Sequence, residues 1–130
     1  MNSKAADYRA WASKAQNDLQ NIANNLSSDI IPWDTVCFHA QQAAEKLLKA
    51  FLVFHNQNPP RTHDLVVLLD NCIHFDSTLA DIEDDLQILH SFAVDARYPG
   101  DFYEAEEEDG RTAYAAAKRI QQAINGRLTG

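Results

Sequence analysis

The sequence predicts an all-α protein: an antiparallel up-and-down four-helix bundle with one additional short helix. Apolar residues recur every three or four positions along the long segments, which is the spacing of an amphipathic helix. Gly and Pro number only four each among 130 residues, few for an all-β chain with many turns. Short breaks separate the segments, and short connections favour antiparallel neighbours. We expect a single domain over residues 1–130, because this length fits one core.

The first two predicted helices follow from the spacing of their apolar side chains. The first runs from about Lys4 to Leu26, and we expect its intervening polar residues, including Asp18, to face solvent. The second follows Pro32, which fixes φ for a first helical turn, and extends to about His55, where the run NQNPP ends it. It is apolar over most of its circumference, which is typical of the central helix of a bundle.

The third and fourth predicted helices are respectively short and long. We expect the third to open with Thr62 as its N-cap and to end near His74. Asp76 or Ser77 can cap the fourth helix, which ends at the breaker of residues 97–100. Apolar positions of the fourth helix alternate in steps of three and four, which is the spacing of a bundle seam. They are Leu79, Ile82, Leu86, Leu89, Ala93 and Ala96.

The last predicted helix runs from about Tyr103 to Leu128. Its first turns are rich in Glu and Asp, and acids there interact favourably with the positive end of the helix dipole. This acidic run therefore requires no bound metal. The cations lie toward the C-terminal end, as the dipole also prefers: Lys118, Arg119 and Arg127.

Charge and cysteine content restrict the class of protein. The formal net charge of −8 argues against broad, nonspecific duplex binding, although it leaves room for a small basic site. Cys37 and Cys72 lie on apolar helical segments, which favours buried free thiols over a disulfide. The N-terminal segment lacks the apolar core of a signal peptide, and no apolar run reaches the roughly 18 residues of a membrane helix. We expect a soluble cytoplasmic protein.

One polar stripe interrupts the apolar central helix. Gln42, Glu45, Lys46 and Lys49 are spaced i, i+3, i+4 and i+7, so they share one helical face, with His39 one turn before them. The stripe is either a solvated edge or the wall of a cleft. On a solvated edge, the pair of Glu45 and Lys49 would stabilise the helix by only about 0.3–0.5 kcal/mol.

Two further polar groups lie outside the central helix. His63 stands beside Thr62 and Asp64, where it is either a helix-start residue or part of a site. His90 and Arg97 are seven residues apart, so they share a face of the fourth helix. Arg97 can also cap the carbonyl groups at the end of its helix.

The histidines do not form a metal-binding pattern. They show no pair at i, i+4 on one face and no HExxH motif, and the Cys37-Phe38-His39 run places its two possible ligands on diverging sides of a helix. We expect no metal site and no cofactor. The five histidines are His39, His55, His63, His74 and His90.

Three sequence elements in this order resemble the HEPN domain (higher eukaryotes and prokaryotes nucleotide-binding). They are FHAQQAAEKLLKAFL, PPRTHDLVVLL and ARYPGDF, and the resemblance extends over about residues 7–125. It implies a helical up-and-down bundle, frequent dimerisation and a partnership with a small nucleotidyltransferase, as in toxin–antitoxin pairs. Many HEPN domains are metal-independent endoribonucleases, in which an Arg is followed four to six residues later by a His near the start of the last helix.

The ribonuclease motif is incomplete in this sequence. Arg97 stands where the motif Arg is expected, but Asp101, Phe102 and Tyr103 occupy the positions four to six residues later. Tyr has an unperturbed pKa of about 10, so it is a poor general base at neutral pH. His90 precedes Arg97 instead of following it. Arg97, His90 and Tyr103 are therefore candidate catalytic residues without a complete motif.

We accordingly expect a nucleotide- or nucleic-acid-binding and interaction module, homodimeric and working with a nucleotidyltransferase. The alternatives are an endoribonuclease that uses Arg97 with His90 or His39, and a purely structural dimerisation module. A third possibility is that Tyr98 or Tyr103 accepts a modification from the partner enzyme. The predicted ligand-binding residues are Gln42, Glu45, Lys46, Lys49, His63, Arg97 and Tyr98.

Overall fold

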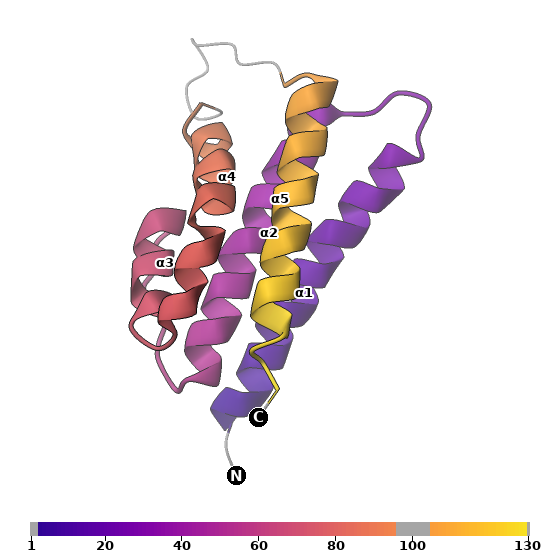
Figure 1. The fold of residues 1–130 in the computed structure, drawn as a ribbon. Coiled ribbons are helices and arrows are strands. Elements are labelled where there is room, and N and C mark those ends of the chain that lie inside the picture. The colour runs from indigo at the N-terminus through magenta and orange to yellow at the C-terminus, as the bar shows by residue number, and fades with distance from the viewer. Residues whose placement is uncertain (1–2, 96–104, 130) are drawn as a thin grey trace.

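The computed structural model describes residues 3–95 and 105–129. The elements are α1 (Ser3–Leu26), α2 (Trp33–Phe54), α3 (Leu65–Ile73), the 3-10 helix η1 (Ser77–Ile82), α4 (Glu83–Asp95) and α5 (Glu107–Asn125). The residues so described contain helices and no strand, which confirms the predicted all-α fold. Figure 1 shows α1, α2 and α5 as the long helices, with α3 and α4 on one flank.

Helix α2 is the central element, as its apolar sequence predicts. It packs against α1, α3, α4 and α5. Burial of a Leu or Phe side chain stabilises a fold by about 1.5–3 kcal/mol, so this one helix supplies much of the core. Its alanines let neighbouring helices approach closely. The buried residues of α2 include Val36, Ala40, Ala43, Ala44, Leu47, Leu48, Phe51 and Leu52.

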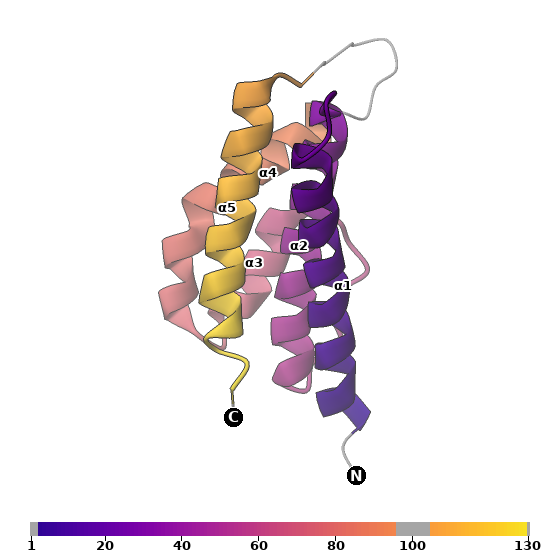
Figure 2. The same ribbon diagram turned by 90° about the vertical axis from the view of Figure 1, so that its right-hand side faces the viewer.

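At each end of the bundle, a hydrogen bond joins two segments that are distant in sequence. In Figure 2 the start of α1 and the end of α5 lie at the same end of the molecule. There the Tyr8 hydroxyl donates to the Leu128 carbonyl over 3.4 Å. At the opposite end the backbone N–H of Ala105 donates to Asp34 Oδ1 over 2.6 Å. This bond fixes the segment before α5 to the first turn of α2.

Two predicted helix starts are wrong by a few residues. The N-cap of α3 is Asp64 instead of Thr62, and its Oδ1 accepts from the backbone N–H of Val66 over 2.9 Å. The Thr62 hydroxyl accepts from the Asp64 N–H over 3.1 Å, which forms a turn just before the cap. Helix α5 begins at Glu107 instead of about 103, because residues 105 and 106 precede it as non-helical backbone.

The fourth helix starts at one of its two predicted caps but is not α-helical throughout. Asp76 is the N-cap of η1, with its carboxylate accepting from the Thr78 N–H over 3.0 Å. The chain becomes α-helical at Glu83. The apolar seam persists across this change, because Leu79, Ile82, Leu86 and Leu89 are all buried.

Asp76 also connects η1 to the C-terminal end of α5. Arg127 Nε donates to Asp76 Oδ2 over 2.7 Å, and Arg127 Nη2 donates to Thr78 Oγ1 over 2.7 Å. Hydrogen bonds from the Thr78 side chain, and then from Arg127, hold the pKa of Asp76 below its ordinary value. The ionised form of Asp76 therefore stabilises the fold.

We predict that Asp76→Asn lowers the melting temperature at neutral pH and that this difference disappears in acid. The folded-state pKa lies below the unfolded value, so the contribution is complete above the unfolded pKa and is lost as pH falls through the folded one. Asn preserves N-cap capacity, so the variant isolates the charge. Thermal unfolding from pH 7 to pH 2 measures the effect, with Asp70→Asn on the exposed side of α3 as control. An Asp76→Asn deficit that stays constant to pH 2 would contradict the prediction.

Both cysteines are free and buried, as predicted. Burial raises the pKa of the Cys37 thiol to about 11, with smaller contributions from Asp109 and Asp34, and burial raises that of Cys72 to about 12. Both thiols are therefore protonated and poor nucleophiles at neutral pH. Among the described helices, none is both long and apolar enough to span a bilayer.

Candidate functional site

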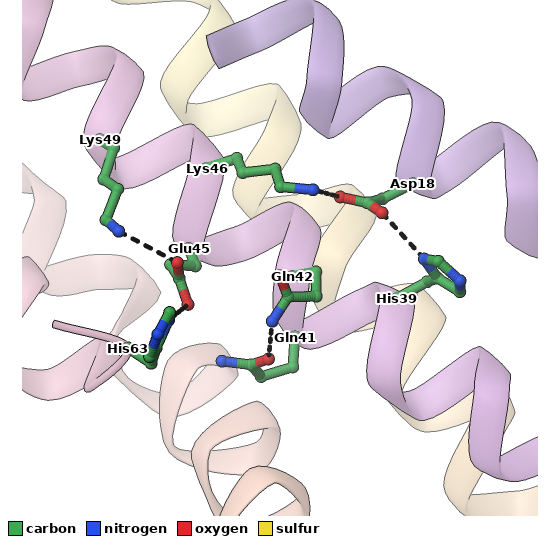
Figure 3. Close-up of polar contacts among 8 residues, drawn as sticks. All are labelled: Asp18, His39, Gln41, Gln42, Glu45, Lys46, Lys49 and His63. Carbon is green, nitrogen blue, oxygen red and sulfur yellow. Dashed lines mark hydrogen bonds and ion pairs between the residues drawn. The ribbon is translucent and has the colours of Figure 1, made fainter. Parts of the chain in front are cut away.

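The polar residues of α2 separate into two groups that face different neighbours (Figure 3). The α1-side group consists of Asp18, His39 and Lys46, and the α3-side group consists of Glu45, Lys49 and His63. Each group has the same design: one carboxylate contacts one Lys Nζ and one His Nδ1. The predicted stripe is therefore not a single surface, since Lys46 turns toward α1 while Glu45 and Lys49 meet His63.

In the α1-side group, both oxygens of Asp18 are engaged. Asp18 Oδ1 lies 2.8 Å from His39 Nδ1, and Asp18 Oδ2 lies 2.6 Å from Lys46 Nζ. The expectation that Asp18 faces solvent is wrong, because it is only 7% exposed. The sequence carried a usable signal: Asp18 is three residues after Ala15 and four before Ile22, so it lies on the apolar face of α1.

In the α3-side group, Glu45 occupies the equivalent position. Glu45 Oε2 accepts from Lys49 Nζ over 3.1 Å, and Glu45 Oε1 lies 2.9 Å from His63 Nδ1. Lys49 Nζ also lies 5.4 Å from the ring centroid of Trp11 on α1. The pairing of Glu45 with Lys49 is confirmed.

The solvated-edge interpretation is wrong for this pair. Glu45 is 4% exposed and Lys49 is 8% exposed, so the energy of an exposed helical ion pair does not apply to them. By contrast, the His63 side chain is 73% exposed. The α3-side group therefore consists of a buried ion pair, Glu45 with Lys49, and a histidine that solvent can reach.

Gln42 lies between the two groups in Figure 3. It is half-buried, and its Nε2 donates to the Oε1 of Gln41 over 2.9 Å. Gln41 is itself only 5% exposed and was not among the predicted site residues. Sequence reasoning missed Gln41 because it falls one position outside the stripe.

His90 of α4 adds a further polar atom to the candidate residues. Its Nδ1 is buried and unpaired among the described residues. The Oδ1 of Asp64 lies 3.9 Å away, which is too long for a hydrogen bond. Buried unpaired polar atoms are uncommon in native proteins, so His90 Nδ1 is a candidate for a hydrogen bond to a water or a ligand. Arg97, Tyr98 and Tyr103 lie outside the described residues, and so does the proposed second wall of the cleft.

These arrangements favour hydrogen bonding and proton transfer over metal binding. A histidine whose Nδ1 contacts a carboxylate has its Nε2 available for a ligand or a proton. His39 and His63 are both held in this way. Within residues 3–95 and 105–129, His, Cys, Asp and Glu side chains form no group of three or more that could hold a metal ion.

Comparison with known proteins identifies the family. The family model described as the HEPN domain matches residues 8–127, nearly the whole chain. The chain belongs to the HEPN domain family. A crystal structure of an archaeal HEPN homologue is similar over 94% of this chain and 98% of that one, with 27% identity and a TM-score of 0.74. A search of curated proteins found no match.

Membership of the HEPN family assigns this chain in general terms to the nucleotide- and RNA-related modules. The resemblance inferred from the elements on α2, before α3 and after α4 is thereby confirmed. The finer assignments of activity, ligand and partner are separate questions.

Proposed function

We propose that this HEPN domain is a nucleotide- or RNA-binding interaction module that works with a small nucleotidyltransferase. The observation that carries the proposal is the pair of carboxylate–histidine–lysine groups beside α2, the α1-side group and the α3-side group, together called the α2 groups. Burying charges is costly, and well-packed apolar residues often stabilise a fold as well as a buried ion pair does. A central helix with a purely structural role would be as stable with apolar residues at these positions. The presence of two such groups therefore favours a binding role.

The geometry favours contacts through histidine and amide groups. Lys46 and Lys49 are each already paired with a carboxylate, so a phosphate would compete with Asp18 or Glu45 for them. His63 contacts Glu45 through Nδ1 only, so the Nε2 of its exposed ring stays available to a ligand, and the Nδ1 of His90 has no hydrogen-bond partner among the described residues. We therefore propose His63 as the principal contact, with Gln42 as a second contact and Arg97, which lies outside the described residues, as a further predicted one.

Calorimetry of the intact chain with ATP and with short single-stranded RNA, with and without the nucleotidyltransferase, tests this function. We expect His63→Ala to weaken binding at least about tenfold, because a hydrogen bond to a charged group contributes about 1.5–3 kcal/mol. The control is His74→Ala, since His74 is also exposed but lies at the far end of α3. No binding of nucleotide, RNA or partner by the native chain would leave a purely structural dimerisation role.

One observation favours an endoribonuclease as the second candidate function. His39 Nδ1 lies 2.8 Å from Asp18 Oδ1, an arrangement that orients an imidazole for proton transfer. RNA cleavage in EDTA by the native chain, lost in both Arg97→Ala and His39→Ala but retained in His74→Ala, would favour cutting over holding. Equal cleavage by all four proteins would point to a contaminating nuclease.

A further inference from the structure

A groove of about 360 Å³ lies along α5 and includes none of the α2 groups among its lining residues. Its lining includes three cations and no carboxylate, although the chain as a whole has a net charge of −8. Leu26 at the end of α1 forms one wall, and the residues from α5 that matter here are Arg111, Tyr114, Lys118 and Arg119. The groove is thus a local basic site on an acidic protein.

The helical period explains why these residues gather there. One face of α5 is buried in the core through Ala113, Ala116, Ala117, Ile120 and Ile124, so the remaining positions face outward. The Gln121 amide donates to Gln16 Oε1 of α1 over 2.6 Å, which holds the two helices together at that level. In Figure 1 the C-terminal part of α1 leans away from α5.

Two cations of the groove, Lys118 and Arg111, are only weakly held by other groups. Lys118 has no carboxylate partner among the described residues, and its Nζ lies 4.8 Å from the ring centroid of Tyr114. Arg111 pairs with Glu107 over 2.7 Å, and both side chains are more than half exposed. Exposed ion pairs are weak, so Arg111 can exchange its partner for a stronger one.

Arg119 is held differently. Its Nε and Nη2 both donate to Asp85 Oδ1, over 3.0 and 2.7 Å. This leaves Nη1 as a donor on a guanidinium that the pairing keeps fixed in place. The groove therefore combines a cation without a carboxylate partner among the described residues, Lys118, with a carboxylate-paired cation, Arg119.

We propose that this groove binds a nucleoside phosphate, with Lys118 and Arg119 on the phosphate and Tyr114 stacked on the base. Phosphate oxygens accept strong hydrogen bonds from Lys and Arg, and they attract Lys118 more strongly than an aromatic ring does. When Lys118 moves to the phosphate, the face of the half-buried Tyr114 ring becomes available to a flat base. The volume is within the range of small-ligand pockets.

The groove shares no residue with the α2 groups. Ligand binding in the groove can therefore be tested independently of the function proposed for those groups. The ligand chemistry has two sources, a free nucleotide or one unit of a single-stranded RNA. Both present a phosphate next to a base. They differ in whether one unit suffices for binding.

Titrations of the intact chain with AMP, a short single-stranded RNA and inorganic phosphate test the proposal. We expect Lys118→Ala and Tyr114→Leu each to weaken binding about tenfold. The matched control is Lys14→Ala, which removes the same charge from an exposed position on α1. Thermal unfolding verifies that each variant is folded; Lys118 is exposed, so Lys118→Glu provides a second variant at little risk to the core.

Each outcome decides one part of the proposal. Binding of AMP that is lost in both groove variants supports a free nucleotide, and binding of RNA alone with the same losses supports a strand. Inorganic phosphate that binds as tightly as AMP would overturn the role of Tyr114. Equal effects of Lys118→Ala and Lys14→Ala, or loss of binding in His63→Ala only, would overturn the groove while leaving the α2 site intact.

Discussion

Replacing Glu45 with alanine is expected to lower the free energy of unfolding by about 3–5 kcal/mol, the cost of breaking a buried ion pair by removing one partner. Lys49 is 8% exposed and would keep its charge in the core without the carboxylate that now accepts from it over 3.1 Å. His63 would lose its partner as well, but its exposed ring can turn to water. Most of the destabilisation therefore comes from Lys49.

Chemical denaturation of the variant measures this effect, and the chain contains a matched control. Glu107 and Arg111 form an i, i+4 ion pair of the same helical spacing, but both side chains are more than half exposed. We expect Glu107→Ala to cost less than about 1 kcal/mol. Similar losses in the two variants would mean that Glu45 does not act as a buried partner.

A double variant tests the mechanism of the loss. Glu45→Ala combined with Lys49→Met removes both charges, so we expect it to be more stable than Glu45→Ala alone. If the double variant unfolds as easily as the single one, the unpaired Lys49 charge is not the cause. Recovery of stability without recovery of nucleotide or RNA binding would support the idea that these charges serve the ligand and not the fold.

The order and type of the helices could be predicted because each depends on local information. The apolar spacing on α2 and the breaker after it identify a central helix before any contact is known. The starts of α3 and α5 were less predictable, because they depend on choices between neighbouring groups. Asp64 caps α3 because the Thr62 hydroxyl accepts from the Asp64 N–H instead. The Asp34 carboxylate, distant in sequence, fixes the segment before α5.

The candidate site could be predicted only in part. The spacing of Glu45 and Lys49 identified their pair, but it could not reveal their burial, which depends on how α1 and α3 cover that side of α2. The prediction that Asp18 faces solvent is wrong because it rests on the polarity of the side chain and not on its position on the apolar face of α1. Pairing with Lys46 and His39 is what makes its burial possible, and those partners lie on another helix.

Replacing Gly110 with alanine is expected to lower the free energy of unfolding by about 1–2 kcal/mol. A Cβ at this position would stand 2.4 Å from Cε3 of Trp33, a rigid ring packed against the core at the start of α2. Overpacking costs about 1–3 kcal/mol, and the better helix propensity of alanine returns at most about 1 kcal/mol. The steric cost therefore exceeds the gain in helix propensity, and Gly110→Ala is expected to destabilise the protein.

Gly126→Ala is the matched control, because the same substitution there meets only ordinary van der Waals contacts. Gly126 has φ −64°, which alanine adopts freely, and its nearest neighbour would be the Gln122 carbonyl oxygen at 3.4 Å. We expect this variant to be unchanged or more stable by up to about 1 kcal/mol. Denaturation of both variants, and of Gly110→Ala in a Trp33→Leu background, separates packing from propensity. If the cost of Gly110→Ala persists without the Trp33 ring, the close approach of α5 to α2 is not what requires glycine.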